Sequence, residues 1–128
     1  MFEADLVTLL KNNSALNTKV GTRIYPLVMP TQPTLPCIVY QVVASTRTYS
    51  HSGFSHLFQP RIQFSCWATT YAEAKDVASK LKAALEGFRG ISGGATLQGA
   101  FVATDIDDYE PGTKLYRVIT DFYIWVGE

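Results

Sequence analysis

One continuous stretch, residues 61–88, constrains the fold more than any other part of the chain. Its first eight residues alternate, with Ile62, Phe64 and Cys66 apolar and polar residues between them. This period of two is typical of a strand with one buried face. Residues 71–86 then carry apolar side chains at three- and four-residue steps, which predicts a helix with one apolar face. A strand that leads directly into such a helix predicts a helix packed on a sheet.

Local signals mark both ends of this helix. Thr70 followed three residues later by Glu73 matches the capping box, in which each side chain satisfies a free amide of the first turn. Gly87, just past the periodic run, suits a left-handed C-cap. The apolar face of the helix is expected to consist of Ala74, Val77, Ala78, Leu81, Leu85 and Phe88.

Composition limits the classes of function. A length of 128 residues favours one domain over residues 1–128. Eleven basic and eleven acidic residues cancel, so the net charge gives no argument for a nucleic-acid partner. Charged residues make up 17% of the chain and hydrophobic residues 47%, which leaves apolar surface for a partner and favours an oligomer.

The sequence shows no targeting or membrane segment. The first residues lack the basic start and apolar run of a secretory signal, and no stretch reaches the roughly 20 apolar residues of a membrane span. We therefore expect a soluble protein made in a cytoplasm, with no membrane partner. Cys37 and Cys66 both lie in apolar, strand-like runs and are interpreted as core thiols rather than as a disulfide.

The rest of the chain supplies one more helix and three more strands. A first helix is expected over residues 3–12, followed by a short helical turn capped by Ser14 and a proline-rich connector. The further strands are expected over residues 37–43, which are apolar on both faces, 96–105, with a bulge at Gly99, and 115–126.

The predicted fold class is therefore α+β, in the order α-β-β-α-β-β. Short links within each strand pair favour antiparallel hairpins, so we expect a four-stranded, mainly antiparallel sheet with two helices packed on one face. The other face is then a mixed surface suited to packing against another subunit. Its residues are Gln63, Ser65, Trp67, Arg117 and Tyr123.

Residues 46–56 form a long link between the first two strands. The segment is rich in Ser, Thr and Gly, yet it carries two aromatic residues and both histidines of the chain. Connections of about a dozen residues are usually functional or disordered. Two interpretations stay open: an arm that is ordered by itself or by a partner, and a plain flexible loop.

Three patterns invite a chemical interpretation, and none supports one. Cys37 and Cys66 are far from zinc-ligand spacing, and His51 and His56 lie five residues apart on the predicted loop. Cys66 is expected to point into the core, where a thiolate nucleophile is disfavoured. The acidic stretch of Asp105, Asp107, Asp108 and Glu110 lacks the glycine and closing glutamate of a calcium loop and is interpreted as a solvated turn. We expect no enzyme, no metal and no cofactor.

The order of several segments resembles a known family. These segments are Glu3-Ala4-Asp5-Leu6, Val20-Gly21-Thr22-Arg23-Ile24-Tyr25-Pro26, Leu35-Pro36-Cys37-Ile38-Val39-Tyr40-Gln41, Arg61-Ile62-Gln63-Phe64-Ser65-Cys66-Trp67-Ala68, Tyr71-Ala72-Glu73-Ala74-Lys75, Tyr116-Arg117-Val118, Asp121-Phe122 and Trp125. Together they resemble the DUF3168 family, the tail completion or tail terminator proteins of long-tailed bacteriophages and prophages. The likeness covers nearly the whole chain.

The resemblance implies a structural role in the virion tail, in a protein made in the cytoplasm of a bacterial host. Such proteins close into a ring, typically a hexamer, that caps the tail tube, ends its polymerisation and offers a surface for the head. The implied partners are further copies of the chain, the major tail tube protein and the head–tail connector protein, with no sequence-specific nucleic acid. The family has no catalytic residues to carry over.

The arm at residues 46–56 and the second sheet face are the expected interface, with Tyr49 and Phe54 as anchors. The full set of expected interface residues is Arg47, Tyr49, His51, Phe54, His56, Trp67 and Tyr123. Two alternatives stay open beside the tail terminator. One is a head-side neck protein that joins the connector to the tail. The other is a small bacterial ligand-binding or enzymatic domain with the loop histidines over a pocket.

Overall fold

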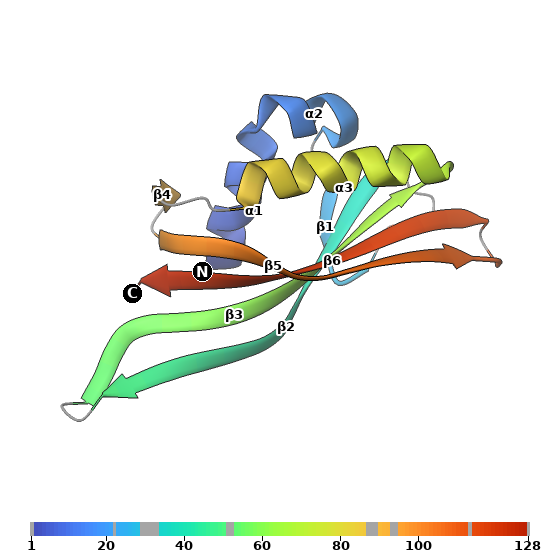
Figure 1. The fold of residues 1–128 in the computed structure, drawn as a ribbon. Helices are drawn as coiled ribbons and strands as arrows, with labels where there is room; N and C mark the ends of the chain where they lie inside the picture. The colour runs from blue at the N-terminus through green and yellow to red at the C-terminus, as the bar shows by residue number, and fades with distance from the viewer. Residues whose placement is uncertain are drawn as a thin grey trace.

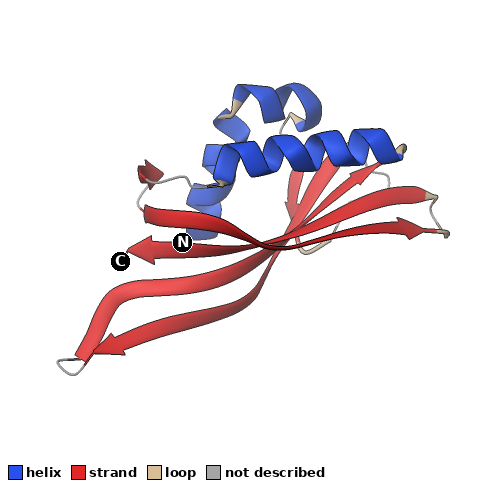
Figure 2. Cartoon of the chain, in the orientation of Figure 1, coloured by secondary structure: helices blue, strands red, loops and turns tan. Residues whose placement is uncertain are grey.

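Helices lie on one side of a twisted sheet in the computed structural model (Figures 1 and 2). The structure describes residues 2–21, 23–28, 34–50, 53–86, 90–92, 95–112 and 114–127. Its elements are α1 (Phe2–Asn12), α2 (Ser14–Val20), β1 (Ile24–Pro26), β2 (Cys37–Ser50), β3 (Gly53–Ala68), α3 (Tyr71–Leu85), β4 (Gly90–Ser92), β5 (Ala95–Glu110) and β6 (Leu115–Gly127).

The α+β class is confirmed, but the predicted number of elements is wrong. The described residues form three helices and a six-stranded sheet, in the order β1-β2-β3-β6-β5-β4, where two helices and four strands were expected. The parallel pair β1–β2 makes the sheet mixed, and every other pairing is antiparallel. Both predicted hairpins, β2–β3 and β5–β6, are present.

The additional elements are short. β1 has three residues and pairs with residues 38–40 of β2, and β4 has three residues and pairs with the start of β5. Three residues are too few to show an apolar period in the sequence. The second helical segment is a full α-helix, and its N-cap is Asn13 rather than the predicted Ser14, because the Asn13 side chain accepts a 3.0 Å hydrogen bond from the Leu16 amide.

The strand-to-helix unit matches its prediction closely. Thr70 is the N-cap of α3, and its hydroxyl accepts a 3.2 Å hydrogen bond from the Glu73 amide. The helix ends at Leu85 with Glu86 as C-cap, while Gly87 and Phe88 lie outside the described residues. The buried residues of α3 are Ala74, Val77, Ala78, Leu81 and Leu85.

The main core lies between the three helices and the sheet. Phe64 of β3 and Phe122 of β6 meet edge to face at its centre, with ring centroids 5.7 Å apart. Leu6, Leu10 and Leu16 bring α1 and α2 onto the same core. None of the described helices has the length and apolar character needed to span a membrane.

Two regions predicted as loop or turn are strand instead. β2 and β3 continue as a hairpin as far as Ser50 and Gly53, so most of the predicted loop at 46–56 is paired strand, and Tyr49 is the register partner of Phe54. β5 likewise continues to Glu110, so the acidic stretch predicted as a turn lies within a strand. The chain reverses only after Glu110, where the Lys114 amide donates a 2.8 Å hydrogen bond to the Glu110 carbonyl.

Candidate interaction surface

The sheet face opposite the helices, here called the open face, carries two arginine clusters in its central strands. In the first, Arg117 of β6 lies between Trp67 of β3 and Asp108 of β5 in the strand register. Its guanidinium carbon is 4.9 Å from the centroid of the Trp67 ring, and its terminal nitrogen pairs with the Asp108 carboxylate. That pairing holds the pKa of Asp108 below its usual value.

The second cluster lies further along the same two strands. Arg61 of β3 is the register partner of Tyr123, with 5.4 Å between the guanidinium carbon and the ring centroid. Its terminal nitrogen also forms a 2.6 Å ion pair with Asp121. Both arginines therefore combine a cation–π contact with a carboxylate contact, which holds their side chains flat on the sheet.

Each cluster contains buried polar atoms that have no hydrogen-bond partner in the described part of the chain. The Nε atoms of Arg61 and Arg117 and the Oδ1 atom of Asp121 are buried and have no hydrogen-bond partner there. Leaving such atoms unpaired costs free energy, and native proteins rarely do so. All three atoms belong to the two arginine clusters of the open face.

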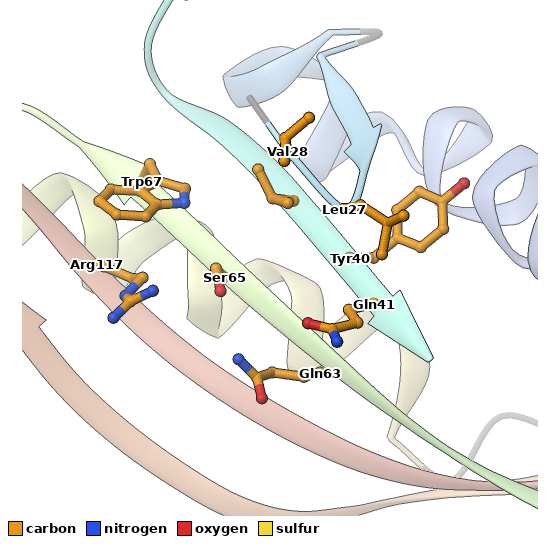
Figure 3. A pocket seen from close by; sticks show the side chains of 9 residues that line it. Leu27, Val28, Tyr40, Gln41, Gln63, Ser65, Trp67 and Arg117 are labelled. Carbon is orange, nitrogen blue, oxygen red and sulfur yellow. The ribbon is translucent and has the colours of Figure 1, made fainter. Parts of the chain in front are cut away.

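A groove of about 350 Å³ adjoins the first cluster (Figure 3). Its lining residues are Leu27, Val28, Val39, Tyr40, Gln41, Gln63, Ser65, Trp67 and Arg117. Trp67 and Val39 are 7% and 8% exposed and pack with Cys37 into a second, smaller core on this side of the sheet. Leu27 and Val28, in contrast, are 67% and 74% exposed. The groove therefore has a fixed floor and an apolar rim open to solvent.

The open face also exposes large apolar side chains away from the groove. Phe101 and Ile106 of β5 are 48% and 51% exposed. Phe101 is the register partner of Tyr123, itself 37% exposed, and its ring covers Gly99. An antiparallel sheet that faced only water would be expected to be polar on this side. The mixed character predicted for this face is therefore present, and it suits a protein partner.

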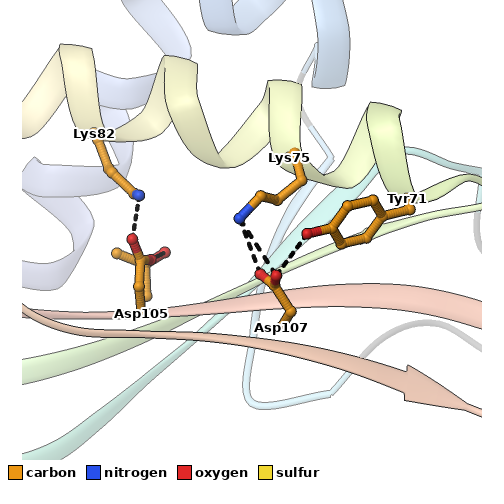
Figure 4. Close-up of polar contacts among 6 residues, drawn as sticks. Tyr71, Lys75, Lys82, Asp105 and Asp107 are labelled. Atoms are coloured by element: carbon orange, nitrogen blue, oxygen red, sulfur yellow. Dashed lines mark hydrogen bonds and ion pairs between the residues drawn. The ribbon is translucent and has the colours of Figure 1, made fainter.

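On the helix side, ion pairs join α3 to β5 (Figure 4). Lys82 pairs with Asp105, while Asp107 accepts hydrogen bonds from Tyr71 at 2.6 Å and from Lys75 at 3.1 Å. The bonds from Tyr71 and Lys75 hold the pKa of Asp107 below its usual value. Burial raises the pKa of Asp105, but the bonds from Lys82 and Thr120 outweigh it, so the net shift is downward. These carboxylates are therefore held by the fold itself and are not arranged as a calcium loop.

The structure separates the residues once considered for metal binding. Ile38 is the register partner of Cys66, so Cys37 and Cys66 lie on opposite faces of the sheet, in different cores. Both thiols are free and fully buried. Burial raises the pKa of Cys37 to about 11 and raises that of Cys66 still further. Within the described ranges, no three histidine, cysteine or acidic side chains gather as metal ligands.

The predicted interface residues fall into two groups. Arg47 and Tyr49 lie on β2, and Phe54 and His56 on β3, all in the hairpin beyond the main core; their side chains, and the whole of His51, lie outside the described part of the structure. Trp67 and Tyr123 lie on the open face, in the two different arginine clusters. Trp67 and Tyr123 therefore do not share one cluster, and the interface of seven residues stays a prediction.

The comparisons with known proteins agree with this architecture. A profile of the family described as tail completion protein gp17 matches residues 4–127. The chain belongs to this tail completion family. It is thus a structural protein of the phage virion tail, and the family resemblance seen in the sequence is confirmed. No functionally curated protein matches the chain.

A solved structure shows the same fold as this tail completion protein. The chain is similar to one in the virion of a native gene transfer agent particle, with a TM-score of 0.82 and 18% sequence identity. The match covers 98% of this chain and 94% of that chain. Because the identity is low, the similarity establishes a shared architecture and leaves individual contacts to be argued from this chain.

Several residues of the surface are not indicated by the sequence patterns. Leu27 and Val28 lie in what was predicted as a connector, and their apolar side chains next to Pro26 were the one available signal. Arg61 and Asp121 are far apart in the chain and meet only through the β3–β6 register. No sequence period could indicate that pair.

Proposed function

We propose that this protein closes the end of the tail tube as a ring of identical subunits, typically six, which stops tube polymerisation and offers a surface to the head connector. The observation that carries the proposal is the family match over residues 4–127. A terminal ring also needs two different contact patches on each subunit, because contacts of this kind close by rotation.

Two features at opposite ends of the sheet support this part of the proposal. The β2–β3 hairpin projects past the helices at one end (Figure 1), and its last pairing with β6 is Leu57 to Gly127. The groove beside Trp67 and Arg117 lies toward the other end of β3. A patch at each end favours head-to-tail contacts over a two-fold symmetric dimer.

We also propose that the protein is not an enzyme. Cys37 and Cys66 are buried thiols with raised pKa values, so neither is an activated nucleophile. The carboxyl groups of Asp105, Asp107 and Asp108 form ion pairs, and their pKa values lie below that of a free aspartate. A carboxylate that acts as a general base near neutral pH is expected to have a raised pKa. These features support a protein that acts through contacts.

The test is an assembly experiment. The purified chain is analysed by size-exclusion chromatography with light scattering and by negative-stain microscopy, and is then added to major tail protein during tube growth. We expect rings with a central hole and tubes whose growth stops when the chain is present. Tubes that keep growing, with no chain bound at their ends, would contradict the proposal.

A hairpin variant sharpens this test. Replacing residues 48–57 by Asn-Gly joins Arg47 to Phe58, which are register partners, through a two-residue turn suited to a hairpin. All register pairs of β3 with β6 are kept except Leu57 with Gly127. We expect the variant to fold, as judged by circular dichroism and its urea midpoint, and to lose ring formation.

A further inference from the structure

The rim of the groove is held in an unfavourable conformation. The Leu27 amide donates a 2.8 Å hydrogen bond to the Tyr40 carbonyl, and the Val28 amide donates a 2.7 Å bond to the Pro26 carbonyl. Leu27 has a φ of 65°, which a residue with a branched apolar side chain rarely adopts. Such local strain is typical of functional sites. It holds two exposed apolar side chains, those of Leu27 and Val28, beside the groove.

The floor of the groove has unused hydrogen-bonding groups. The Gln41 and Gln63 amides and the Ser65 hydroxyl can each donate and accept, and no hydrogen bond of their side chains is found in the described part of the chain. The Arg117 guanidinium beside these groups carries no uncompensated charge, because it pairs with Asp108. The apolar rim can contact an apolar side chain, and the polar floor can form hydrogen bonds with an uncharged, extended backbone.

The β2–β3 hairpin of the same chain matches that chemistry. Its tip, residues 48–56, contains no acidic residue and places Tyr49 opposite Phe54 in the register. The whole stretch from Thr34 to Ala72 also lacks Asp and Glu. A tip with two aromatic residues and no negative charge can enter an apolar groove without burying an unpaired carboxylate.

The hairpin cannot reach the groove of its own subunit. Phe54 and Trp67 lie near opposite ends of the single strand β3, so they are separated by about 43 Å at the usual strand rise of about 3.3 Å per residue. Strands β2 and β3 extend together past the helices toward this end of the hairpin (Figures 1 and 2). A contact between tip and groove therefore requires two copies of the chain.

We propose that the groove lined by Leu27, Val28 and Trp67 receives the β2–β3 hairpin tip of a neighbouring copy of the chain. Tyr49 or Phe54 then packs against the apolar rim, and Gln41, Gln63 and Ser65 bond the incoming backbone. Each copy gives a tip at one end and a groove at the other, which is the head-to-tail contact that a ring needs. This inference rests on the proposed ring and identifies its contact.

Photo-crosslinking of the full chain tests the contact. Phe54 is replaced by p-benzoylphenylalanine, the assembled protein is irradiated, and the product of twice the chain mass is digested with trypsin. We expect the crosslinks to map to the fragment of residues 24–47, at Leu27 or Val28, or to Trp67. Crosslinks that map elsewhere on the chain, or only to the major tail protein, would overturn the assignment of a second copy as occupant.

Two matched substitutions test whether crosslinking depends on the groove or on the exposed surface in general. Val28→Lys adds a charge at a site that is 74% exposed in the single subunit, so the fold does not depend on it, and we expect about tenfold less crosslinked product. Ile106→Lys, at a site 51% exposed outside the groove, is the control and should crosslink as before. Equal yields from both variants would overturn the proposal.

The two experiments also show whether the proposed contact or the proposed function is the one that fails. Rings that stop tube growth but crosslink outside the groove would refute the contact and leave the function intact. Absence of both rings and tube capping would contradict the function, and with it the inference.

Discussion

Thr120 donates a 2.8 Å hydrogen bond to Asp105 across the β5–β6 pair. The Thr120 side chain is fully buried, while Asp105 also pairs with Lys82 of α3. One carboxylate therefore connects two strands and a helix, and its pair with Lys82 is drawn in Figure 4. This connection explains why an aspartate, a residue disfavoured in strands, is accommodated within β5.

Replacing Thr120 by Val keeps the shape of the side chain and removes the hydroxyl donor. We expect the free energy of unfolding to fall by about 1 kcal/mol, because a hydrogen bond to a charged group is lost and is partly replaced by Lys82 and solvent. Urea unfolding followed by circular dichroism at pH 7 measures the change. Thr104→Val is the control, since Thr104 is exposed on β5, and should change stability by less than about 0.5 kcal/mol.

Stability should depend on pH through the paired aspartates. The pKa of Asp107 is lowered by Tyr71 and Lys75, and that of Asp76 is lowered by Lys80 and Lys19. Because the folded values lie below the unfolded value of about 3.9, the stability that they contribute is present above that pH and is lost as pH falls through the folded values. We expect the urea midpoint to decrease between about pH 5 and pH 3.

Asp107→Asn tests the source of this dependence. The urea midpoint of the variant should decrease less at acid pH than that of the wild type. In 0.5 M salt, which screens exposed ion pairs, the decrease of the wild-type midpoint should also become smaller. Glu110→Gln serves as control, because Glu110 forms no ion pair with the described residues. An unchanged pH profile in Asp107→Asn would show that these pairs do not contribute.

The sequence predicts those parts of the fold in which one face of a strand or helix is buried, because burial leaves an apolar period in the sequence. The alternation in β3 and the apolar stripe of α3 each reflect burial against one core, so the pattern and the structure agree from Arg61 to Leu85. β1 and β4 are strands only because of the neighbours they pair with. The outer part of the β2–β3 hairpin is rich in Ser and Thr and shows no strict apolar alternation in the sequence, which favoured a loop.

The candidate surface was predictable only in part. Its mixed character follows from the residues that alternate with the core positions, such as Gln63 and Ser65. The groove does not follow, because its rim is set by the turn at Leu27, which is fixed by a bond to the Tyr40 carbonyl. The two arginine clusters depend on strand register, which single-sequence patterns do not specify across long separations.

The two cysteines should be unreactive in the folded protein. Both are buried, and burial raises the pKa of Cys37 to about 11, so the thiolate is scarce at neutral pH. We expect no reaction with a thiol reagent such as DTNB at pH 7.5 until urea unfolds the chain, when both react. Cys37→Ala and Cys66→Ala distinguish the two sites. Rapid labelling of the native protein at either site would contradict the buried placement.

Gly99 and Phe101 should be energetically coupled. A Cβ atom at Gly99 would lie 2.9 Å from Cε2 of Phe101, so the ring that covers this glycine would have to move. We expect Gly99→Ala to destabilise the protein by about 0.5 kcal/mol, less than overpacking in a core, because the exposed ring can move aside. In a Phe101→Ala background the ring is gone, and the same change should be neutral or stabilising by about 0.5 kcal/mol, because alanine restricts the unfolded chain.

A double-mutant cycle based on urea unfolding measures this coupling, with an expected interaction energy of about 1 kcal/mol. Ile106→Ala is the matched control, since Ile106 is also an exposed apolar residue of β5 but does not cover Gly99, and its effect should add to that of Gly99→Ala. Additivity in the Phe101→Ala background would show that the ring does not pack on Gly99. The coupling would instead establish that Phe101 is held on the open face before any partner arrives, which lowers the entropy cost of binding there.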